Sequence, residues 1–155
     1  MEYQSDFLVI GSGLAGLGYA LKVAQHGTVN VITKRDIMQT STSQAQGGIA
    51  AVLSPDDSFD LHVKDTLASG VGLCHQDTVE LVVRSGPERI AELVSLGAHF
   101  DLSGDATSHV DLAREGGHSR RRIIHAHDMT GQEVENILVA RVLEQPNITV
   151  FENQI

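Results

Sequence analysis

The sequence contains one cysteine, no tryptophan and three prolines. Because a single cysteine cannot form an internal disulfide, we expect a reducing compartment such as the cytoplasm. No apolar stretch is long enough to cross a bilayer, and the first residues show no export signal. The formal net charge of -9 opposes broad affinity for nucleic acids or anionic lipids. We therefore expect a cytoplasmic protein with neither a nucleic-acid nor a membrane partner.

The start of the chain has the pattern of a βαβ unit. Residues 6–10 hold a short apolar run without polar alternation, which predicts a strand buried on both faces, as in a parallel sheet. Residues 17–25 have helical composition and are followed by Gly27, and residues 29–32 predict a second buried strand. A strand, a helix and a second strand in this order predict an α/β fold with parallel strands.

The rest of the chain predicts more helices and one more strand. Helices are expected at 60–69, 77–83, 87–97 and 130–143, and Pro87 is expected to begin or kink the third of them, which Gly97 ends. Two residue pairs have the spacing of a capping box, Asp77 with Glu80 and Thr130 with Glu133. Residues 149–152 predict a further strand. Three or four parallel strands are fewer than a doubly wound sheet normally has, so we expect the sheet to be incomplete at its carboxyl end.

A glycine pattern lies between the first strand and the first helix. Gly11, Gly13 and Gly16 form G-x-G-x-x-G. The first glycine permits a tight turn, the second lets the backbone approach a pyrophosphate, and the third lets the helix pack closely on the strand. The amino end of the helix offers unpaired N–H groups to phosphate oxygens. The alternative is a glycine-rich turn without a ligand, and the strand–helix–strand context favours a dinucleotide site over it.

The end of the second strand lacks the acidic residue that usually holds the ribose of NAD. Thr33 and Lys34 stand there, and Asp36 has the expected count but lies past the strand. This substitution weakens the case for NAD. A lysine at this place can contact a phosphate or the adenosine end of FAD, and a solvated lysine is the alternative.

Residues 36–57 predict an ordered loop without a core element. Within it, residues 40–51 read Thr-Ser-Thr-Ser-Gln-Ala-Gln-Gly-Gly-Ile-Ala-Ala. Hydroxyls, amides and a glycine pair are suited to wrap a flat polar ring and to bond phosphate. By composition alone, an ordinary surface loop explains this segment almost as well.

Two longer motifs accompany the glycine pattern. Residues 45–51 read Ala-Gln-Gly-Gly-Ile-Ala-Ala; residues 114–123 read Arg-Glu-Gly-Gly-His-Ser-Arg-Arg-Arg-Ile, followed by His125-Ala126 and Asp128-Met129-Thr130-Gly131. With the opening Gly-Ser-Gly-Leu-Ala-Gly and with Thr33-Lys34, they resemble the fumarate reductase/succinate dehydrogenase flavoprotein family. The second motif resembles the L-aspartate oxidase branch of that family. The resemblance extends over essentially the whole chain.

The resemblance implies a Rossmann-like FAD-binding domain, with residues 1–155 as its amino-terminal part. It implies that the FAD pyrophosphate lies at Ser12, Gly13, Leu14 and Ala15, within the turn from Gly11 to Gly16, and that Lys34 lies near the adenosine half. It implies that the flavin is surrounded by Ser41, Thr42, Ser43, Gln44, Ala45, Gln46, Gly47 and Gly48. In respiratory members a histidine of this loop is bonded covalently to FAD. The matching position here is Ser41, so we expect FAD to be noncovalent.

Glu115 is the residue that bears most on the substrate. A carboxylate at this place would repel a plain dicarboxylate but attract the α-ammonium of L-aspartate. The resemblance implies that relatives acting on dicarboxylates carry an apolar residue here and that Glu115 orients the substrate. The alternative is a surface glutamate paired with Arg114 or Arg121.

The resemblance implies that FAD accepts a hydride from the Cα of L-aspartate, giving iminoaspartate, and that the electrons pass to O2 or fumarate. This is the first step of NAD biosynthesis, and quinolinate synthase consumes the product. A capping domain with the catalytic arginine, a returning segment and a helical domain are expected beyond Ile155. The 155-residue chain is therefore expected to be inactive alone and to bind FAD weakly or not at all. A soluble fumarate reductase and a nucleotide-binding module that functions at this length are the alternatives.

Three other features have less specific interpretations. Arg120, Arg121 and Arg122 are typical of a solvated face or an ion-pair network, because no aromatic residues interleave them. His118, His125 and His127 lack a second cluster of ligands, so we expect no metal site, and we expect His118 and His125 to line or support the active site. Cys74 is expected to be a buried or partly buried structural thiol.

Overall fold

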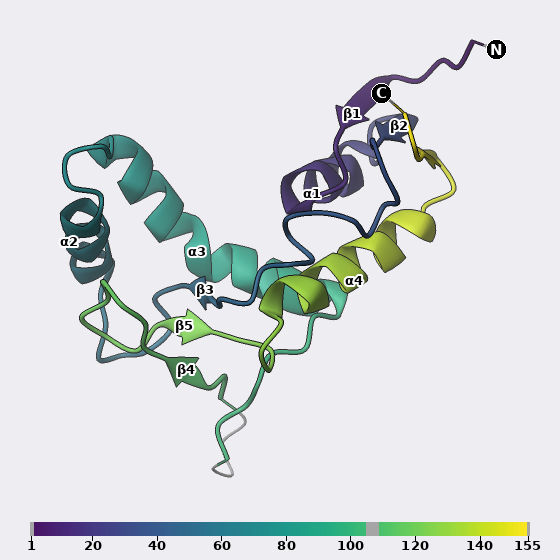
Figure 1. The fold of residues 1–155 in the computed structure, drawn as a ribbon. Helices are drawn as coiled ribbons and strands as arrows, with labels where there is room; N and C mark the ends of the chain where they lie inside the picture. Colours follow the sequence, from purple (N-terminus) through teal and green to yellow (C-terminus); the bar gives the residue numbers. More distant parts are fainter. Residues whose placement is uncertain (1, 105–108, 155) are drawn as a thin grey trace. The chain divides into compact units, whose positions relative to one another are not determined.

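The computed structural model describes residues 2–104 and 109–154, and the chain divides into two compact units. Met1–Gln46 and Gly131–Ile155 form one, which we call the sheet unit. Gly47–Thr130 form the other, the insert unit. Figure 1 shows that the sheet unit is made from the two ends of the chain.

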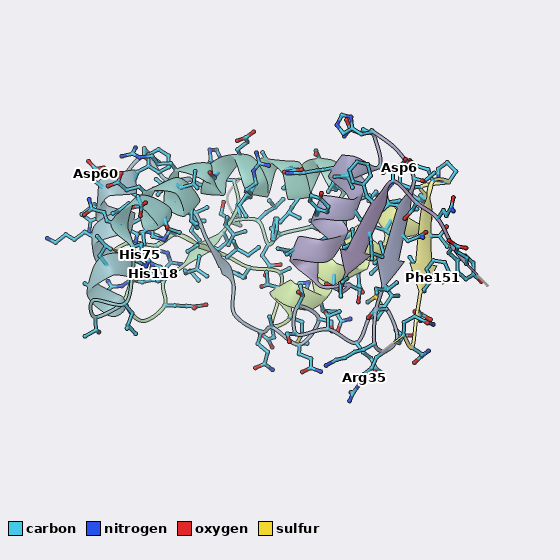
Figure 2. The ribbon with its side chains drawn as sticks, turned by 90° about the horizontal axis from the view of Figure 1, so that it is seen from above. Asp6, Arg35, Asp60, His75, His118 and Phe151 are labelled. Atoms are coloured by element: carbon cyan, nitrogen blue, oxygen red, sulfur yellow. The ribbon has the colours of Figure 1, made fainter. Side chains whose placement is uncertain are left out.

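The sheet unit is built on three parallel strands. They are β1 (Phe7–Ile10), β2 (Val29–Ile32) and β6 (Ile148–Phe151), in the order β1-β2-β6. Phe7 is in register with Val29, and Val29 with Ile148, so the carboxyl ends of all three strands lie at one edge. In Figure 2, Asp6 before β1 and Arg35 after β2 lie at opposite ends of these strands. The structure confirms the three predicted parallel strands.

Helix α1 (Leu14–Val23) covers one face of this sheet. Val9, Ala20, Val29 and Val31 form the core between them. The prediction that the first strand is buried on both faces is wrong, because the side chains of Leu8 and Ile10 are 60% and 79% exposed. β1 is an edge strand of the sheet, and these two side chains alternate to the face opposite Val9.

Helix α4 (Thr130–Leu143) lies in the sheet unit apart from its first residue. It was predicted at its observed position, but Thr130 is its first residue and not a cap before it. The Thr130 hydroxyl accepts a hydrogen bond from the amide of Ala126 instead. Gly131 lies so close to the loop before β3 that a Cβ atom there would overlap the Thr42 carbonyl oxygen.

The insert unit contains a helix pair and a small antiparallel sheet. Val63, Val79 and Val83 form the core between α2 (Phe59–Ser69) and α3 (Gln76–Leu96). The sheet has the strand order β3-β5-β4, and its strands are β3 (Ile49–Ala50), β5 (Ile123–Ile124) and β4 (Leu112–Ala113). The segment predicted as a loop without a core element therefore contributes a short strand, β3. α2 ends before Gly70, as predicted.

Helix α3 is one helix where the sequence predicted two stretches, 77–83 and 87–97, with Pro87 beginning or kinking the second. It runs unbroken through Pro87, because Val79, Val83 and Ile90 keep one face buried on both sides of the proline. Asp77 does not form the predicted capping box: His75 is the cap residue, and the Asp77 carboxylate accepts from the amide of Thr78. Gly97 ends the helix in the left-handed region, at φ 110°, as a terminal glycine commonly does.

Within the described residues, every helix is too short or too polar to cross a bilayer.

Gly131→Ala should destabilise the protein by roughly 1–3 kcal/mol, since the added methyl group would overlap the Thr42 carbonyl oxygen and approach Ala45. Gly18→Ala in α1 is the matched control, because a Cβ atom there meets no neighbouring atom. We expect that control to be neutral or to stabilise by up to about 1 kcal/mol. Denaturant unfolding measures both, and equal effects would contradict the close contact at Gly131.

Candidate functional site

The glycine turn after β1 has the geometry that a pyrophosphate site requires. Gly11 adopts a left-handed φ of 105°, and its amide donates to the Ile32 carbonyl oxygen at 2.8 Å. A Cβ atom at Gly16 would overlap the Gly11 carbonyl oxygen. Gly13 precedes α1 as its cap residue and makes no side-chain cap bond. The turn therefore brings backbone and helix amino terminus to one place without intervening side chains.

The polar loop lies against the start of α1. The Leu14 amide donates to the Thr42 hydroxyl at 3.1 Å. Ser12 is buried, and its hydroxyl donates to Thr33 at the end of β2 at 3.1 Å. Because the Ser12 hydroxyl is already bonded to Thr33, the backbone of this turn is the group best placed to bind a phosphate. Two segments predicted to hold the cofactor are thus brought together within the sheet unit.

Inside the loop, the predicted cofactor residues differ in exposure. Ser43 is buried, and its hydroxyl donates to the Thr40 carbonyl oxygen at 2.9 Å. The Ala45 amide donates to the Thr42 carbonyl oxygen at 3.0 Å, which closes the turn. Several of the remaining predicted residues are exposed: Leu14, Ala15, Lys34, Ser41, Gln44, Ala45, Gln46 and Gly47. The loop therefore holds its own shape through Ser43 and leaves most of its other side chains accessible.

In the insert unit, the Glu115 side chain approaches Gly48, the second residue of the Gly47-Gly48 pair. The Gly48 amide lies 3.5 Å from Glu115 Oε1, the outer limit of a hydrogen bond. A Cβ atom at Gly48 would overlap Ile123 and the Ile124 carbonyl oxygen, so glycine permits this approach to β5. Glu115 begins a turn in which its carbonyl oxygen accepts from the His118 amide at 3.3 Å.

The alternative interpretation of Glu115, an ion pair with a neighbouring arginine, is not observed. Among the described residues no ion pair joins Glu115 to Arg114 or Arg121. Arg121 Nε instead donates to the Leu112 carbonyl oxygen at 2.6 Å. The Glu115 side chain is exposed. Its carboxylate is therefore available to a ligand beside the Gly48 backbone.

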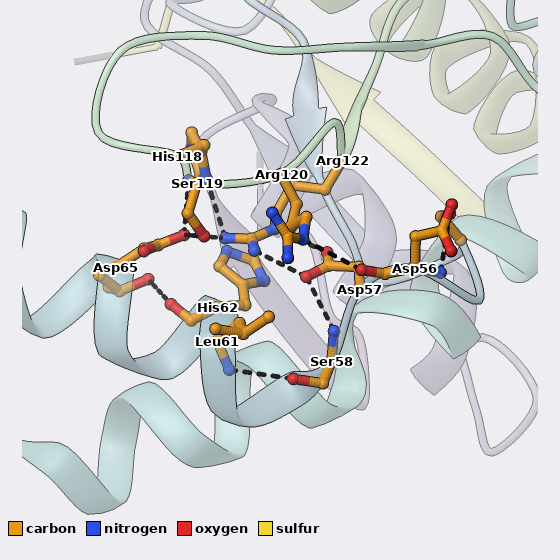
Figure 3. A network of polar contacts seen from close by, with 12 residues as sticks. Asp56, Asp57, Ser58, Leu61, His62, Asp65, His118, Ser119, Arg120 and Arg122 are labelled. Carbon is orange, nitrogen blue, oxygen red and sulfur yellow. Dashed lines mark hydrogen bonds and ion pairs between the residues drawn. The ribbon is translucent and has the colours of Figure 1, made fainter.

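Arg122 is the functional-site neighbour that the sequence did not single out. Its side chain is 0% exposed, and it pairs with Asp57 and Asp65 at 2.7 Å each (Figure 3). Two of its nitrogens contact the two oxygens of Asp57, and a third contacts Asp65. The predicted ion-pair network of the arginine cluster is confirmed at Arg122. The pattern Arg-Arg-Arg gave no sign of which arginine was buried.

The carboxylates around Arg122 are held in their ionised form. Burial alone would raise the pKa of Asp57, but hydrogen bonds from Arg122 and from the Ser58 amide bring it below its ordinary value. Burial also opposes ionisation of Asp65, yet the Ser119 amide and hydroxyl, with Arg122, lower its pKa to about 2. These charges stabilise the guanidinium in turn and raise the pKa of Arg122 despite its burial.

Two histidines adjoin this network. Arg122 Nη1 lies 3.3 Å from His118 Nδ1, and because a guanidinium can only donate, Nδ1 is the acceptor. The rings of His118 and His62 are 5.6 Å apart. Burial and the nearby Arg122 charge lower the pKa of His62. The contact between Arg122 and His118 therefore joins the turn that begins at Glu115 to this network.

The other predicted histidines belong to a separate acidic cluster. His125 Nδ1 lies 2.9 Å from Asp101 and Nε2 3.3 Å from Asp111, and the His127 amide donates to Asp101 at 2.9 Å. Within residues 2–104 and 109–154, no three or more His, Cys, Asp or Glu side chains gather as metal ligands. Cys74 is partly buried, with Sγ 3.9 Å from the Thr66 carbonyl oxygen, as predicted for a structural thiol.

Residues 6–155 match the family described as FAD binding domain. The chain belongs to this family. FAD is therefore its cofactor, and the backbone turn at Gly11–Gly16 with its helix amino terminus fits the pyrophosphate of that group.

Several curated relatives are longer proteins named L-aspartate oxidase. The chloroplastic L-aspartate oxidase 2-b of Nicotiana tabacum is 56% identical over 148 residues, which are 96% of this chain and 22% of that protein. The L-aspartate oxidase of Yersinia pestis is 45% identical over 153 residues, 97% of this chain and 29% of that protein. The chain thus spans about a quarter of the length of these relatives.

A solved structure shows the same fold. The quinol fumarate reductase FrdA of E. coli has a TM-score of 0.90 and 34% sequence identity, covering 97% of this chain and 26% of that chain. This similarity confirms the predicted α/β, FAD-binding fold class with its parallel sheet. It also confirms the resemblance to the fumarate reductase/succinate dehydrogenase flavoproteins.

Arg122→Met should cost roughly 3–5 kcal/mol of unfolding free energy, because it leaves two buried carboxylates without a counter-ion. Arg84→Met is the matched control: Arg84 on α3 pairs with Asp60 on α2, but the two side chains are 54% and 90% exposed. The control should cost less than about 1 kcal/mol. Denaturant unfolding at neutral pH compares them, and a similar loss in both variants would contradict the structural role of Arg122.

Because of Asp65, the free energy of unfolding should depend on pH in the acid range. Its pKa is about 2 in the folded protein and near its ordinary value of 3.8 when unfolded, so the unfolded state binds the proton first as the pH falls. The stabilisation is fully present above about pH 5 and is lost as the pH falls through about 2. Asp65→Asn should flatten this part of the curve of unfolding free energy against pH. Asp60→Asn, at an exposed site of the same helix, should leave it unchanged.

Proposed function

We propose that the protein carrying this chain oxidises L-aspartate to iminoaspartate with FAD as the electron acceptor. The high identity to proteins named L-aspartate oxidase supports this reaction. The observation that carries the proposal is the position of Glu115, whose exposed carboxylate lies 3.5 Å from the Gly48 amide.

Glu115 is suited to recognise an amino acid. Its carboxylate attracts an α-ammonium group, and it repels a dicarboxylate that lacks one. The buried network of Arg122 holds the segment that carries this carboxylate, because Arg122 Nη1 contacts His118, three residues after Glu115. Glu115 is therefore the substrate-orienting residue of the proposed site.

FAD, when bound, would supply the acceptor for the hydride that leaves the substrate Cα. The backbone from Ser12 to Ala15 would hold its pyrophosphate, and Lys34 would meet the adenosine half. The loop from Ser41 to Gly48 would surround the ring system. Because serine stands at position 41, where respiratory relatives carry a histidine, FAD is held without a covalent bond.

The electrons pass to O2 or fumarate, and quinolinate synthase is the enzyme class that consumes the product, in the first step of NAD biosynthesis. Residues outside positions 1–155 supply the catalytic arginine and the remaining substrate contacts. The cytoplasm stays the predicted compartment, while the plant relatives are named chloroplastic.

A soluble fumarate reductase is the second candidate, favoured by the structural similarity to the E. coli fumarate reductase. The two candidates differ in what they require of Glu115. A dicarboxylate substrate gains nothing from a carboxylate at this position, whereas an amino-acid substrate gains a charge-assisted hydrogen bond.

Glu115→Gln should lower kcat/KM for L-aspartate about ten- to hundredfold, which corresponds to the loss of a hydrogen bond between two charged groups. Glu115→Phe should lower it further and reduce the preference for aspartate over succinate. Steady-state rates of the FAD-loaded protein with both substrates measure this. Glu133→Gln, a glutamate on α4, is the charge-matched control. Unchanged aspartate preference in both Glu115 variants would favour the fumarate reductase.

A further inference from the structure

The backbone turn that carries Glu115 is closed by its own hydrogen bond. The His118 amide donates to the Glu115 carbonyl oxygen at 3.3 Å, across Gly116 and Gly117. Gly117 has a φ of 83°, which the third residue of a type II turn requires and which glycine adopts without strain. Glu115 is thus the first residue of a closed turn, and Ser119 is the first residue after it.

Ser119 attaches this turn to helix α2. Its amide and its hydroxyl both donate to Asp65 Oδ2 at 2.8 Å (Figure 3). Arg122 Nη1 donates to the same oxygen at 2.7 Å, so three donors converge on it. The Asp65 side chain is 14% exposed, and these bonds hold its pKa at about 2, so the carboxylate is ionised at neutral pH. Because the acceptor is charged, the bonds from Ser119 are stronger than bonds between neutral groups.

Helix α2 contacts the turn at a second point. A Cβ atom at Gly117 would lie 2.7 Å from the Ser69 hydroxyl oxygen, so this glycine lies directly against the helix. Asp65 and Ser69 are four residues apart in α2, which places them on one face of the helix. The same face of α2 therefore contacts both Gly117, within the turn, and Ser119, just after it.

The Glu115 carboxylate is held less firmly than the backbone of its turn. The side chain is exposed, and its contact with the Gly48 amide is 3.5 Å long, the outer limit of a hydrogen bond. So weak a contact does little to fix the place of the carboxylate. That place therefore depends on the backbone from which the Glu115 side chain extends.

We propose that Ser119 is a positioning residue for substrate recognition: through Asp65 it fixes the turn that sets the place of the Glu115 carboxylate beside Gly48. This inference rests on the proposed role of Glu115 in orienting L-aspartate. Ser119 acts through Glu115 and does not itself touch the substrate. A carboxylate that is already in place binds an α-ammonium group more tightly, because less freedom is lost on binding.

The test compares Ser119→Ala, which removes the hydroxyl bond to Asp65 and keeps the amide bond, with Ser119→Thr, which restores a hydroxyl. Ser95→Ala on α3 is the matched control, because Ser95 is also exposed and its hydroxyl donates to the Glu92 carbonyl oxygen of its own helix. Each variant is made in the full-length, FAD-loaded protein, alone and together with Glu115→Gln. KM and kcat are measured for L-aspartate and for succinate.

We expect Ser119→Ala to raise KM for L-aspartate about fivefold, to keep kcat within about twofold and to reduce the preference for aspartate over succinate. The effect is smaller than the loss of a whole hydrogen bond to a charged group, since the Ser119 amide still bonds Asp65. Ser119→Thr and Ser95→Ala should stay within about twofold of the unsubstituted protein. In the Glu115→Gln protein, Ser119→Ala should change KM no further, because residues that act through one another are not additive.

Two results would overturn the inference and leave the proposed function standing. One is an unchanged KM in Ser119→Ala where Glu115→Gln is impaired. The other is an equal loss from Ser119→Ala with and without Glu115→Gln, which would mean that Ser119 does not act through Glu115. If Glu115→Gln itself leaves the kinetics with L-aspartate unchanged, the proposed role of Glu115 fails, and the inference fails with it.

Discussion

The pairing of Arg122 with Asp57 and Asp65 is the interaction on which the insert unit depends. The Arg122 side chain joins Asp57, in the segment before α2, to Asp65 on α2. The Arg122 backbone joins the segments of the small sheet. The Ala51 amide donates to the Arg122 carbonyl oxygen, and the Arg122 amide donates to Ala113. One residue thus fixes both the small sheet and its position on the helix pair. A buried charge of this kind is tolerated because two carboxylates pair with it and hydrogen-bond three of its nitrogens.

Glu115 and Gly48 are brought together as a consequence of this arrangement. Gly48 precedes β3, and Glu115 follows β4, and both strands pair with β5. The carboxylate itself is exposed and makes one weak contact, so its identity matters little to the fold. A substitution at such a position can therefore change the substrate while the backbone arrangement stays the same. For this reason function has to be argued from the site and not from the fold.

The sheet unit depends on close backbone packing. Gly16 lets α1 approach the turn after β1, and Gly131 lets α4 approach the polar loop. In both places a side chain would occupy space that the backbone needs. Glu135 on α4 is fully buried, and among the described residues neither of its carboxyl oxygens has a hydrogen-bond partner, which sets it apart from the paired carboxylates around Arg122. The buried acids of the two units thus differ, because those around Arg122 are paired and Glu135 is not.

The sequence by itself determined the parallel strands, the glycine turn, the FAD-binding class and the helix that begins at Thr130. Each strand and helix shows in a local pattern of residue types, and the glycine turn shows in a motif whose residue types are required by a phosphate or a tight turn. Only the tertiary structure decided that Arg122, of three consecutive arginines, is buried, because its partners lie 57 and 65 positions away. It also decided that α3 continues through Pro87 and that Leu8 and Ile10 are exposed. Burial depends on which residues pack against a side chain, and a short stretch of sequence does not show which distant residues these are.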